Sequence, residues 1–389
     1  MPMTTRLYYT DSYLTDFDAR IVARADADRR IYLDRTAFYP TSGGQPFDTG
    51  TLAGAAVVDV IDEGDRIAHV LATPLPADVE HVDARIDWAR RFDHMQQHSG
   101  QHLLSAVFAD RFGAPTVSVH FGAEVSTLDL DTPALGPDRL LAAEEHANAF
   151  VFENRPLHVS FEDAATATGL RKAPDRGGTL RIVTIDGIDR SACGGTHVRA
   201  TGEIGPILIR RTERVRGALR VEFVCGGRAV RRARADHDAL AAMAQSLSTS
   251  LDELPALVRT HAERLEEAER LAKKLDTELA AYRARERYEA ASPDASGIRR
   301  VVERRATGSL DALRPMAQAF CAFPRAIFIG AIDAPPTVLL AASEDSGIDA
   351  ARTLRAALTA AGGRGGGSPR LAQGTVPSAA QLDALIRAL

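Results

Sequence analysis

The residues best suited to chemistry form two pairs with one spacing. His98 and His102 enclose Ser-Gly-Gln, and Cys193 and His197 enclose Gly-Gly-Thr. Positions i and i+4 share one face of a helix, so both imidazoles of the first pair can reach one ion. In the second pair, the glycines permit a tight backbone that brings thiolate and imidazole together. Three histidines and one cysteine make a tetrahedral set of nitrogen and sulfur donors, for which zinc (Zn²⁺) is the natural ion.

Each pair alone has an ordinary explanation. Two histidines on one helix face are more often partnered by neighbouring side chains, and a lone cysteine is usually a buried apolar residue. Four ligands favour a closed structural zinc site, whereas a catalytic site keeps one position open. If one ligand exchanges with water, the metal can lower the pKa of that water or polarise an ester carbonyl. Peptide hydrolysis is disfavoured, because Ser99 stands where zinc proteases carry a glutamate base.

Composition limits the class of protein. The chain has 389 residues, enough for two to four domains, with 45% hydrophobic and 25% charged residues, as in soluble globular proteins. A net charge of -5 argues against a uniformly basic nucleic-acid binder. Three cysteines cannot form a disulfide framework, and no signal peptide or apolar membrane span is visible. We therefore expect a cytoplasmic protein without a membrane partner.

Patterning predicts an α+β fold with four parts. Residues 1–88 carry short apolar runs bounded by Asp, Gly and Pro, which predict a barrel-like β subdomain. Residues 89–239 predict an α/β zinc domain, with helices over 89–112 and 137–151 and strands near 117–119, 125–130, 157–161, 180–186, 204–210 and 219–224. Residues 292–389 predict a small α/β domain, with strands near 299–303, 326–330 and 337–341 and helices near 311–322, 348–361 and 378–388.

Residues 240–291 predict a long helical arm. A seam of side chains spaced alternately four and three positions apart covers four heptad-like repeats: Leu254, Val258, His261, Leu265, Ala268, Ala272, Leu275, Leu279 and Tyr282. Pro255 fits the first turn of such a helix. The seam can pack on its own protein, form an antiparallel hairpin, or join two chains in a coiled coil.

Taken together, these motifs resemble the editing domain of alanyl-tRNA synthetases. The chain looks more closely similar to the long form of the free-standing AlaX-type trans-editing proteins. Residues 36–50 resemble their glycine-rich motif, residues 117–130 their hairpin, and residues 362–374 the glycine-rich signature of the DHH-associated domain that ends the synthetases. The metal motifs alone are shared with threonyl-tRNA synthetase editing domains, so the flanking motifs carry the specificity.

The resemblance implies a zinc-dependent hydrolase held together by His98, His102, Cys193 and His197. Its substrate would be the ester of mischarged tRNA(Ala), Ser-tRNA(Ala) and possibly Gly-tRNA(Ala), without aminoacylation, since the glycine-rich motif already begins at residue 36. An alanine pocket discriminates against one small group by about 1–3 kcal/mol, so a second hydrolytic sieve is needed. The alternatives are a noncatalytic tRNA-binding module and a zinc hydrolase of another ester.

Further residues are candidates for catalysis and binding. His120 could relay a proton near neutral pH, and Gln101 replaces the threonine common before the second histidine in the synthetases. A water nucleophile is expected, because no Ser-His-Asp set is visible. Six residues could bind substrate or simply order the backbone: Thr41, Ser42, Gly43, Gly44, Gln45 and Thr196. We expect His94 on the surface, and Cys225 and Cys321 as inert core thiols.

The basic residues are unevenly placed. Residues 199–234 contain ten arginines and three acids, a local charge of +7 directly after the second metal pair. Such a patch beside an active site could steer tRNA phosphates, or it could be consumed by ion pairs with the acidic N-terminal region. The glycines of residues 362–367 predict a flexible turn or a cradle of backbone amides for RNA phosphate. By resemblance, the terminal domain helps to bind tRNA or to form a homodimer.

Overall fold

The computed structural model describes residues 3–172 and 177–389. The chain forms two compact units, residues 1–243 and 244–389. The first unit contains both the predicted β subdomain and the predicted zinc domain, and the second contains most of the predicted arm together with the terminal domain. Helix α3 (Gly226–Ser246) runs across the boundary.

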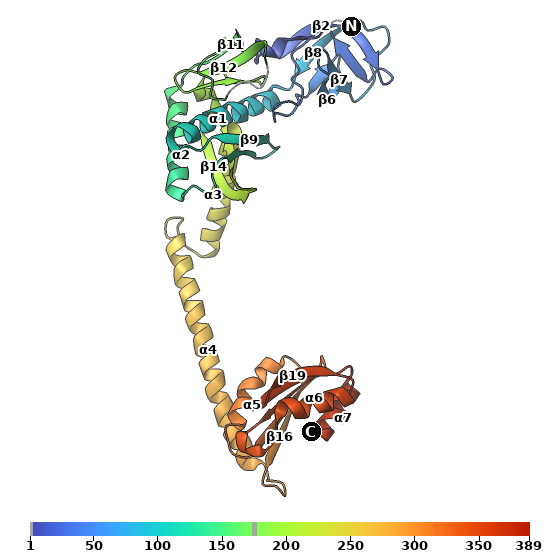
Figure 1. The fold of residues 1–389 in the computed structure, drawn as a ribbon, viewed down its shortest axis with the longest axis vertical. Helices are drawn as coiled ribbons and strands as arrows, with labels where there is room; N and C mark the ends of the chain where they lie inside the picture. The colour runs from blue at the N-terminus through green and yellow to red at the C-terminus, as the bar shows by residue number, and fades with distance from the viewer. Residues whose placement is uncertain (1–2, 173–176) are drawn as a thin grey trace. The chain divides into compact units, whose positions relative to one another are not determined.

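The N-terminal strands close into a barrel, as the sequence predicts (blue in Figure 1). Its strands run in the order β2 (Asp16–Ala25), β3 (Arg30–Leu33), β7 (Ile67–Leu71), β6 (Ala55–Asp62), β5 (Gly50–Leu52) and β8 (His81–Ile86). Alternate residues of β8, Val82, Ala84 and Ile86, point into the apolar interior, as the period of two in a strand requires. Two short strands, β1 (Thr5–Arg6) and β4 (Arg35–Thr36), pair in parallel beside it.

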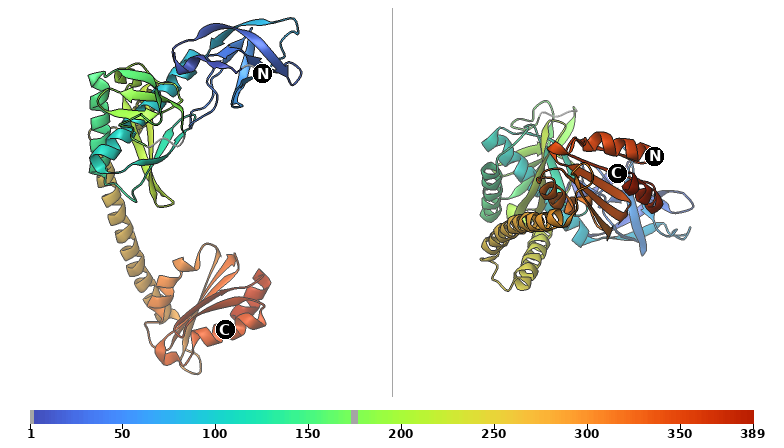
Figure 2. Two further views of the ribbon diagram at one scale, coloured as in Figure 1. Left: turned by 45° about the horizontal axis from the view of Figure 1, so that its top comes forward. Right: turned by 90° about the horizontal axis from the view of Figure 1, so that it is seen from below.

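Helix α1 (Trp88–Phe112) follows the barrel directly and forms the centre of the first unit (Figures 1 and 2). The Asp87 carboxylate caps its first turn, and Gly113 ends it in the left-handed conformation. One sheet has the order β14 (Ile207–Val215), β15 (Ala218–Cys225), β10 (Ser126–Leu130) and β9 (Thr116–Phe121). Helix α2 (Pro137–Glu153) packs beside α1, and a smaller sheet contains β11 (Leu157–Asp163), β12 (Thr179–Ile185) and β13 (Asp189–Ala192).

The second unit is built on one sheet, with the order β16 (Arg299–Thr307), β17 (Ala326–Ala334), β18 (Thr337–Ala342), β20 (Leu371–Thr375) and β19 (Arg364–Ser368). Helices α6 (Ala350–Ala360) and α7 (Ala379–Ala388) bury one face of the sheet, through residues such as Leu354 and Leu382. Helix α5 (Arg314–Phe320) and the end of α4 (Leu254–Ala290) bury the other face.

The glycine-rich segment near the C-terminus is a strand, so the predicted flexible turn is wrong. It forms β19 at the edge of the sheet and pairs with β20. A Cβ on Gly365 would lie 2.3 Å from the carbonyl oxygen of Gln373, and one on Gly367 would lie 2.4 Å from that of Leu371. The glycines are therefore needed for close approach of two strands, a tertiary demand that outweighs their low strand propensity.

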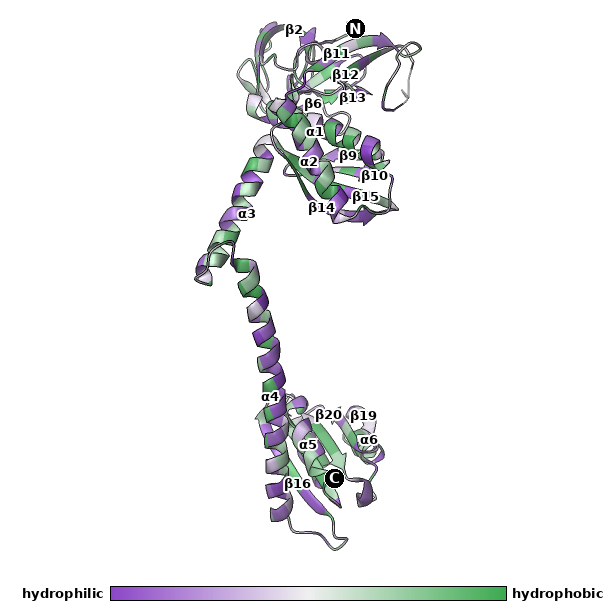
Figure 3. Ribbon diagram, turned by 90° about the vertical axis from the view of Figure 1, so that its left-hand side faces the viewer, coloured by the Kyte–Doolittle hydropathy of each residue, from purple (hydrophilic) through white to green (hydrophobic). Residues whose placement is uncertain are grey.

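Helix α4 forms over the predicted seam and has Pro255 in its first turn. Most large apolar residues of the seam are exposed, with Leu265 at 61% and Tyr282 at 76%. Figure 3 shows hydrophobic and hydrophilic residues interspersed along α4. The seam is therefore not packed on the second unit, to which α4 belongs. Among the described residues, no helix has both the length and the apolar character needed to cross a membrane.

Candidate metal centre and its cavity

The four residues predicted as ligands converge on one point. One donor atom from each of His98, His102, Cys193 and His197 lies within 4.8 Å of all the others. Sγ of Cys193 is 3.4 Å from Nε2 of His98 and 3.3 Å from Nε2 of His197. Nitrogen and sulfur ligands of a tetrahedral zinc ion lie about 3.5 Å apart, so this donor set fits zinc in both spacing and chemistry.

The loop that carries Cys193 and His197 is shaped by its contacts with the helix. A Cβ on Gly195 would lie 2.1 Å from Cε1 of His98, so only glycine lets the loop approach α1 this closely. Arg181, on β12, donates from Nη1 to the carbonyl oxygens of Cys193 (2.7 Å) and Gly195 (2.9 Å). The buried guanidinium therefore fixes the curve of the loop.

Each histidine of the centre has a dedicated partner at Nδ1. Nδ1 of His98 lies 2.9 Å from Oε1 of Gln45, Nδ1 of His102 lies 2.9 Å from Oδ2 of Asp189, and Nδ1 of His197 lies 3.1 Å from Oγ of Ser99. A proton held at Nδ1 leaves Nε2 as the metal-binding nitrogen. Outer partners of this kind orient the ligands of protein metal sites. The three inward nitrogen donors are therefore preorganised.

Charges in the centre favour an ionised sulfur. Burial by itself would raise the pKa of the Cys193 thiol, but the charges of His98 and His197 and hydrogen bonds from His102 and His197 hold that pKa well below its usual value. Burial would also raise the pKa of Asp189, yet the hydrogen bond from His102 and the charge of Arg171 lower it to about 2. A thiolate is the metal-binding form of cysteine.

A cavity of about 550 Å³ opens beside the four ligands. His98, His102 and Cys193 line it together with Gln101. The remaining walls come from the glycine-rich segment, α1, β9 and the loops around β13: Tyr39, Ser42, Gly43, Ala109, Pro115, Thr116, Val117, Ser118, Val119, Arg171, Lys172, Ser191, Ala192, Gly194 and Gly195. Of the predicted substrate-binding residues, Ser42 and Gly43 reach the cavity.

The predicted substrate-binding residues of the glycine-rich turn, including Ser42 and Gly43, also order its backbone. Ser42 and Gln45 exchange backbone hydrogen bonds of 3.1 and 2.9 Å across a tight turn, and Gly43 and Gly44 take φ values of +57° and +84°, which favour glycine. Thr41 accepts a hydrogen bond from the backbone of Phe47. These contacts explain why the segment is glycine-rich.

Gln45 and Thr196 bond to each other, outside the cavity. Nε2 of Gln45 donates to Oγ1 of Thr196 (2.8 Å), and the Thr196 amide donates to Oε1 of Gln45 (3.2 Å). Both side chains are fully buried. The pair joins the glycine-rich turn to the metal-binding loop.

Two histidines do not lie where the sequence suggested. Val119 packs on the core and Phe121 contacts the ring of His98, so His120 between them points to the opposite face of the sheet and does not line the cavity. His94 is only 4% exposed, so the expected surface position is wrong. Helix α1 is covered around most of its circumference, and burial lowers the pKa of His94 to about 4.

Cys225 and Cys321 are buried, as predicted, and burial raises their pKa values.

A buried ion pair that sequence reasoning missed holds the glycine-rich segment on α1. Arg91 is fully buried, bonds to both carboxylate oxygens of Asp48, and donates to the carbonyl oxygens of Ser12 and Ala37. Asp48 in turn accepts a hydrogen bond of 2.6 Å from the backbone of Tyr39. The available signal was an arginine two turns before the histidine pair, together with an aspartate in the glycine-rich segment.

The arginines of residues 199–234 are largely neutralised by ion pairs. Six of the ten have a carboxylate partner: Arg210 and Arg232 with Asp236, Arg211 with Glu222, Arg220 with Asp129, and Arg228 and Arg231 with Asp93. Within the described ranges, Arg214, Arg216 and Arg234 have no ion pair and are exposed. Three of these pairs lie within residues 210–236 and the other three join Asp93 or Asp129, so the free basic charge is smaller than the sequence indicates.

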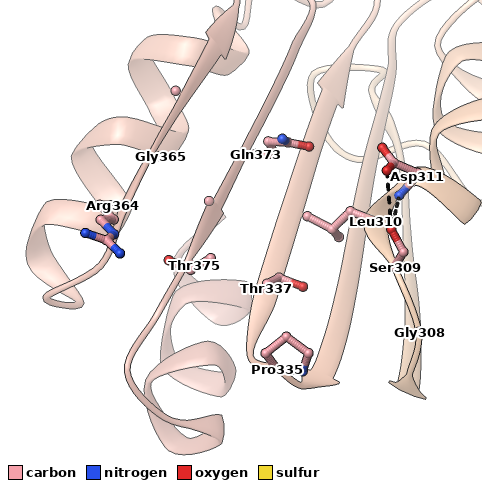
Figure 4. Close-up of a pocket in the computed structure, with 12 residues that line it drawn as sticks. Gly308, Ser309, Leu310, Asp311, Pro335, Thr337, Arg364, Gly365, Gln373 and Thr375 are labelled. Atoms are coloured by element: carbon pink, nitrogen blue, oxygen red, sulfur yellow. Dashed lines mark hydrogen bonds between the residues drawn. The ribbon is translucent and has the colours of Figure 1, made fainter. Parts of the chain in front are cut away.

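A larger cavity, of about 670 Å³, lies in the second unit (Figure 4). Arg364 and Gly365 of β19, Gln373 of β20 and Thr337 of β18 lie along one side, and Asp311 lies opposite. Its lining contains no histidine or cysteine. The donor chemistry, and not the cavity size, therefore identifies the centre in the first unit as the candidate active site.

Comparison with known proteins confirms the resemblance inferred from the motifs. A family model described as "Threonyl and Alanyl tRNA synthetase second additional domain" matches residues 180–221, which include Cys193 and His197. An alanine–tRNA ligase of Korarchaeum cryptofilum is 32% identical over 97% of this chain and 44% of its own length. The alanyl-tRNA editing protein AlaX-L of Pyrococcus horikoshii is 35% identical over 59% of each chain. The chain thus spans about half the length of these relatives.

A solved structure of the C-Ala domain of Aquifex aeolicus alanyl-tRNA synthetase also matches. The match covers 24% of this chain and 87% of that chain, at 16% identity and a TM-score of 0.22. A score this low supports no conclusion about the fold.

Proposed function

We propose, since the chain is related to the alanyl-tRNA editing proteins of the AlaX type, that it hydrolyses the ester of mischarged tRNA(Ala). Ser-tRNA(Ala) is the principal proposed substrate, and Gly-tRNA(Ala) is a second one. The observation that carries this proposal is the convergence of three histidines and one cysteine beside an open cavity. A zinc ion held by these residues would polarise the ester carbonyl or lower the pKa of a water molecule.

Gln101 gives the cavity a means of recognising serine. Its Nε2 donates to Oγ of Ser105 (2.8 Å), which in turn lies 2.7 Å from Oγ1 of Thr116. This series of hydrogen bonds occupies the amide nitrogen of Gln101 and leaves its Oε1 as an acceptor at the cavity wall. A substrate hydroxyl can donate to that oxygen, whereas alanine and glycine cannot. Sites that hydrogen-bond a hydroxyl discriminate strongly against analogues lacking it.

The residues around the ligands perform the remaining tasks. Gln45, Ser99 and Asp189 hold protons at the Nδ1 atoms, so the histidines keep their orientation while the ester binds. Tyr39 and Val119 add apolar surface to the cavity wall. A water molecule is the proposed nucleophile: among the described residues, the Ser99 hydroxyl that contacts a ligand is buried and already bonded to Nδ1 of His197.

The second unit is proposed to bind tRNA or to join two chains, through the cavity beside β19 or the exposed seam of α4. A cytoplasmic location completes the proposal. Removal of residues 244–389 should weaken binding of tRNA or break a dimer, while metal content stays unchanged. Unchanged affinity and unchanged oligomeric state would contradict this part.

A deacylation panel tests the activity. Ser-, Gly- and Ala-charged tRNA(Ala) are incubated with the metal-loaded protein, and loss of charged tRNA is followed over time. The expected result is rapid loss of Ser-tRNA(Ala) and little loss of Ala-tRNA(Ala). If Ser-tRNA(Ala) survives a stoichiometric amount of protein, the editing proposal fails, and the noncatalytic module or a different ester remains.

A further inference from the structure

Among the residues that the structure describes, Arg171 and Lys172 are the charged side chains outside the ligand set that line the cavity of the metal centre. The Arg171 amide donates to the carbonyl oxygen of Arg190 (2.9 Å), which attaches this segment to the start of β13. The cavity is therefore suited to an anionic group as well as to a neutral ester.

Asp189 connects this positive wall to the metal ligands. Its Oδ2 lies 2.9 Å from Nδ1 of His102, and its Oδ1 accepts a hydrogen bond of 2.7 Å from Nε of Arg171. Oγ of Ser191 donates to the same carboxylate. Asp189 is only 5% exposed, so its carboxylate has fixed neighbours. One buried side chain thus positions both a metal ligand and a cavity arginine.

The guanidinium of Arg171 still has donors to spare. Nε and Nη2 are used by Asp189 and by Ser191, the latter at 3.0 Å. Among the residues that the structure describes, Nη1 of Arg171 has no hydrogen-bond partner, and the side chain is 23% exposed. A guanidinium carries five N–H donors and pairs well with phosphate oxygens.

We propose that Arg171 binds the phosphate of the terminal nucleotide of the substrate, and that Asp189 holds Arg171 and His102 at a fixed separation. This proposal rests on the proposed function. In an aminoacyl-tRNA, the anionic group nearest to the ester is the phosphate on the 5′ side of the terminal nucleoside. Binding it at Arg171 places the ester carbonyl beside the ligand set, because both sites are fixed by one carboxylate.

A pair of stable analogues tests the role of Arg171. Adenosine carrying a 3′-serylamide in place of the ester is prepared with and without a 5′-phosphate, and its binding is measured by calorimetry. Loss of the phosphate should weaken binding to the unaltered protein about tenfold or more, as expected for a charge-assisted contact. The variant Arg171→Gln should bind both analogues with nearly the same affinity. In Arg171→Lys, the loss of affinity on removal of the phosphate should be intermediate, because lysine keeps the positive charge but not the paired N–H donors of the guanidinium.

The outcomes separate this proposal from the proposed function. Equal binding of both analogues by the unaltered protein would show that the 5′-phosphate is not bound. If removal of the phosphate weakens binding to Arg171→Gln as much as it weakens binding to the unaltered protein, Arg171 is not the residue that binds the phosphate. If neither analogue binds at all, the proposed function fails as well.

A second variant tests the positioning role of Asp189 without using activity. Asp189→Asn should weaken zinc binding about 10–100-fold in competition with a chelator, as loss of an outer-shell carboxylate does in other sites. It should also reduce the contribution of the 5′-phosphate. The matched control is Asp186→Asn, an exposed aspartate before the same strand, which should change neither value. Circular dichroism confirms that each variant is folded. Unchanged zinc affinity in folded Asp189→Asn would overturn the positioning role.

Discussion

Gln45 and His98 meet in a hydrogen bond of 2.9 Å between Oε1 and Nδ1, although one lies in a glycine-rich turn and the other on a helix. The same oxygen accepts the amide of Thr196 in the metal-binding loop. The glutamine therefore joins three segments at one atom. Gln45 therefore serves in the glycine-rich motif to orient the metal ligand His98, and it does not line the cavity.

Replacement of Gln45 should loosen the metal centre. In Gln45→Ala, His98 loses the acceptor that fixes its orientation, and we expect zinc affinity to fall about tenfold. The measurement is chelator competition at constant pH. Ser42→Ala in the same turn is the control, because the Ser42 side chain has no contact with a ligand. Equal affinities in the two variants would contradict the assignment.

Loss of the sulfur ligand should remove the metal. Cys193→Ala leaves three nitrogen donors, so we expect substoichiometric zinc after dialysis and a matching loss of deacylation. Metal content is measured by elemental analysis of the purified protein. Cys321→Ala, in the other unit, should keep full occupancy. Full zinc occupancy in Cys193→Ala would show that the ligand set is misassigned.

A variant of His120 tests the catalytic role that the sequence suggested against the outward position that the structure shows. A required proton relay contributes about 100-fold or more to a rate. Because His120 points away from the cavity, we expect His120→Ala to retain its deacylation rate within about twofold. Single-turnover kinetics with Ser-tRNA(Ala) provide the measurement, and a hundredfold loss would restore the catalytic role.

Gln101 should govern the preference for serine. Removal of its acceptor in Gln101→Ala costs one hydrogen bond to the substrate hydroxyl, so we expect kcat/KM for Ser-tRNA(Ala) to fall about tenfold. The value for Gly-tRNA(Ala), which has no hydroxyl to lose, should change little. A parallel fall for both substrates would indicate general damage to the cavity.

The barrel contains a histidine that should remain neutral well into acid. His69 is fully buried, with Nε2 2.8 Å from Oγ1 of Thr36 and Nδ1 3.1 Å from the carbonyl oxygen of Ile31. Burial lowers its pKa from 6.5 to about 4. The unfolded chain therefore binds the proton more readily, and the stabilisation is complete above pH 6.5 and is lost as the pH falls towards 4. The full effect is about 3 kcal/mol.

Two measurements check this behaviour. The ring proton resonances of His69 should not titrate between pH 7 and about 5. The free energy of unfolding should depend less steeply on pH in His69→Gln than in His81→Gln, which alters an exposed histidine of the same barrel. An inflection near pH 6.5 for His69 would rule out the buried neutral form.

The sequence was sufficient for most of the elements and for the cluster of His98, His102, Cys193 and His197, but not for the contacts that hold them. Helix 137–151 was predicted almost to its observed end, because its apolar positions repeat with the helical period. Residues Gln45, Ser99 and Asp189 could not be assigned, since their roles depend on which Nδ1 atom each one meets in three dimensions. His120 was assignable in principle: the alternation of Val119 and Phe121 already indicates the buried face. Strand β19 was missed because its glycines are required by a neighbouring strand.

The three Nδ1 contacts also bear on the order in which the chain folds. They join residues 53, 87 and 98 positions apart, namely Gln45 to His98, His102 to Asp189, and Ser99 to His197. Contacts this distant along the chain form late, after the closure of long loops. A chain in which the barrel, the helix or the small sheet is still unformed would lack at least one oriented ligand. We therefore expect tight metal binding to mark completed folding, and a nascent or damaged chain to lack the proposed hydrolytic centre.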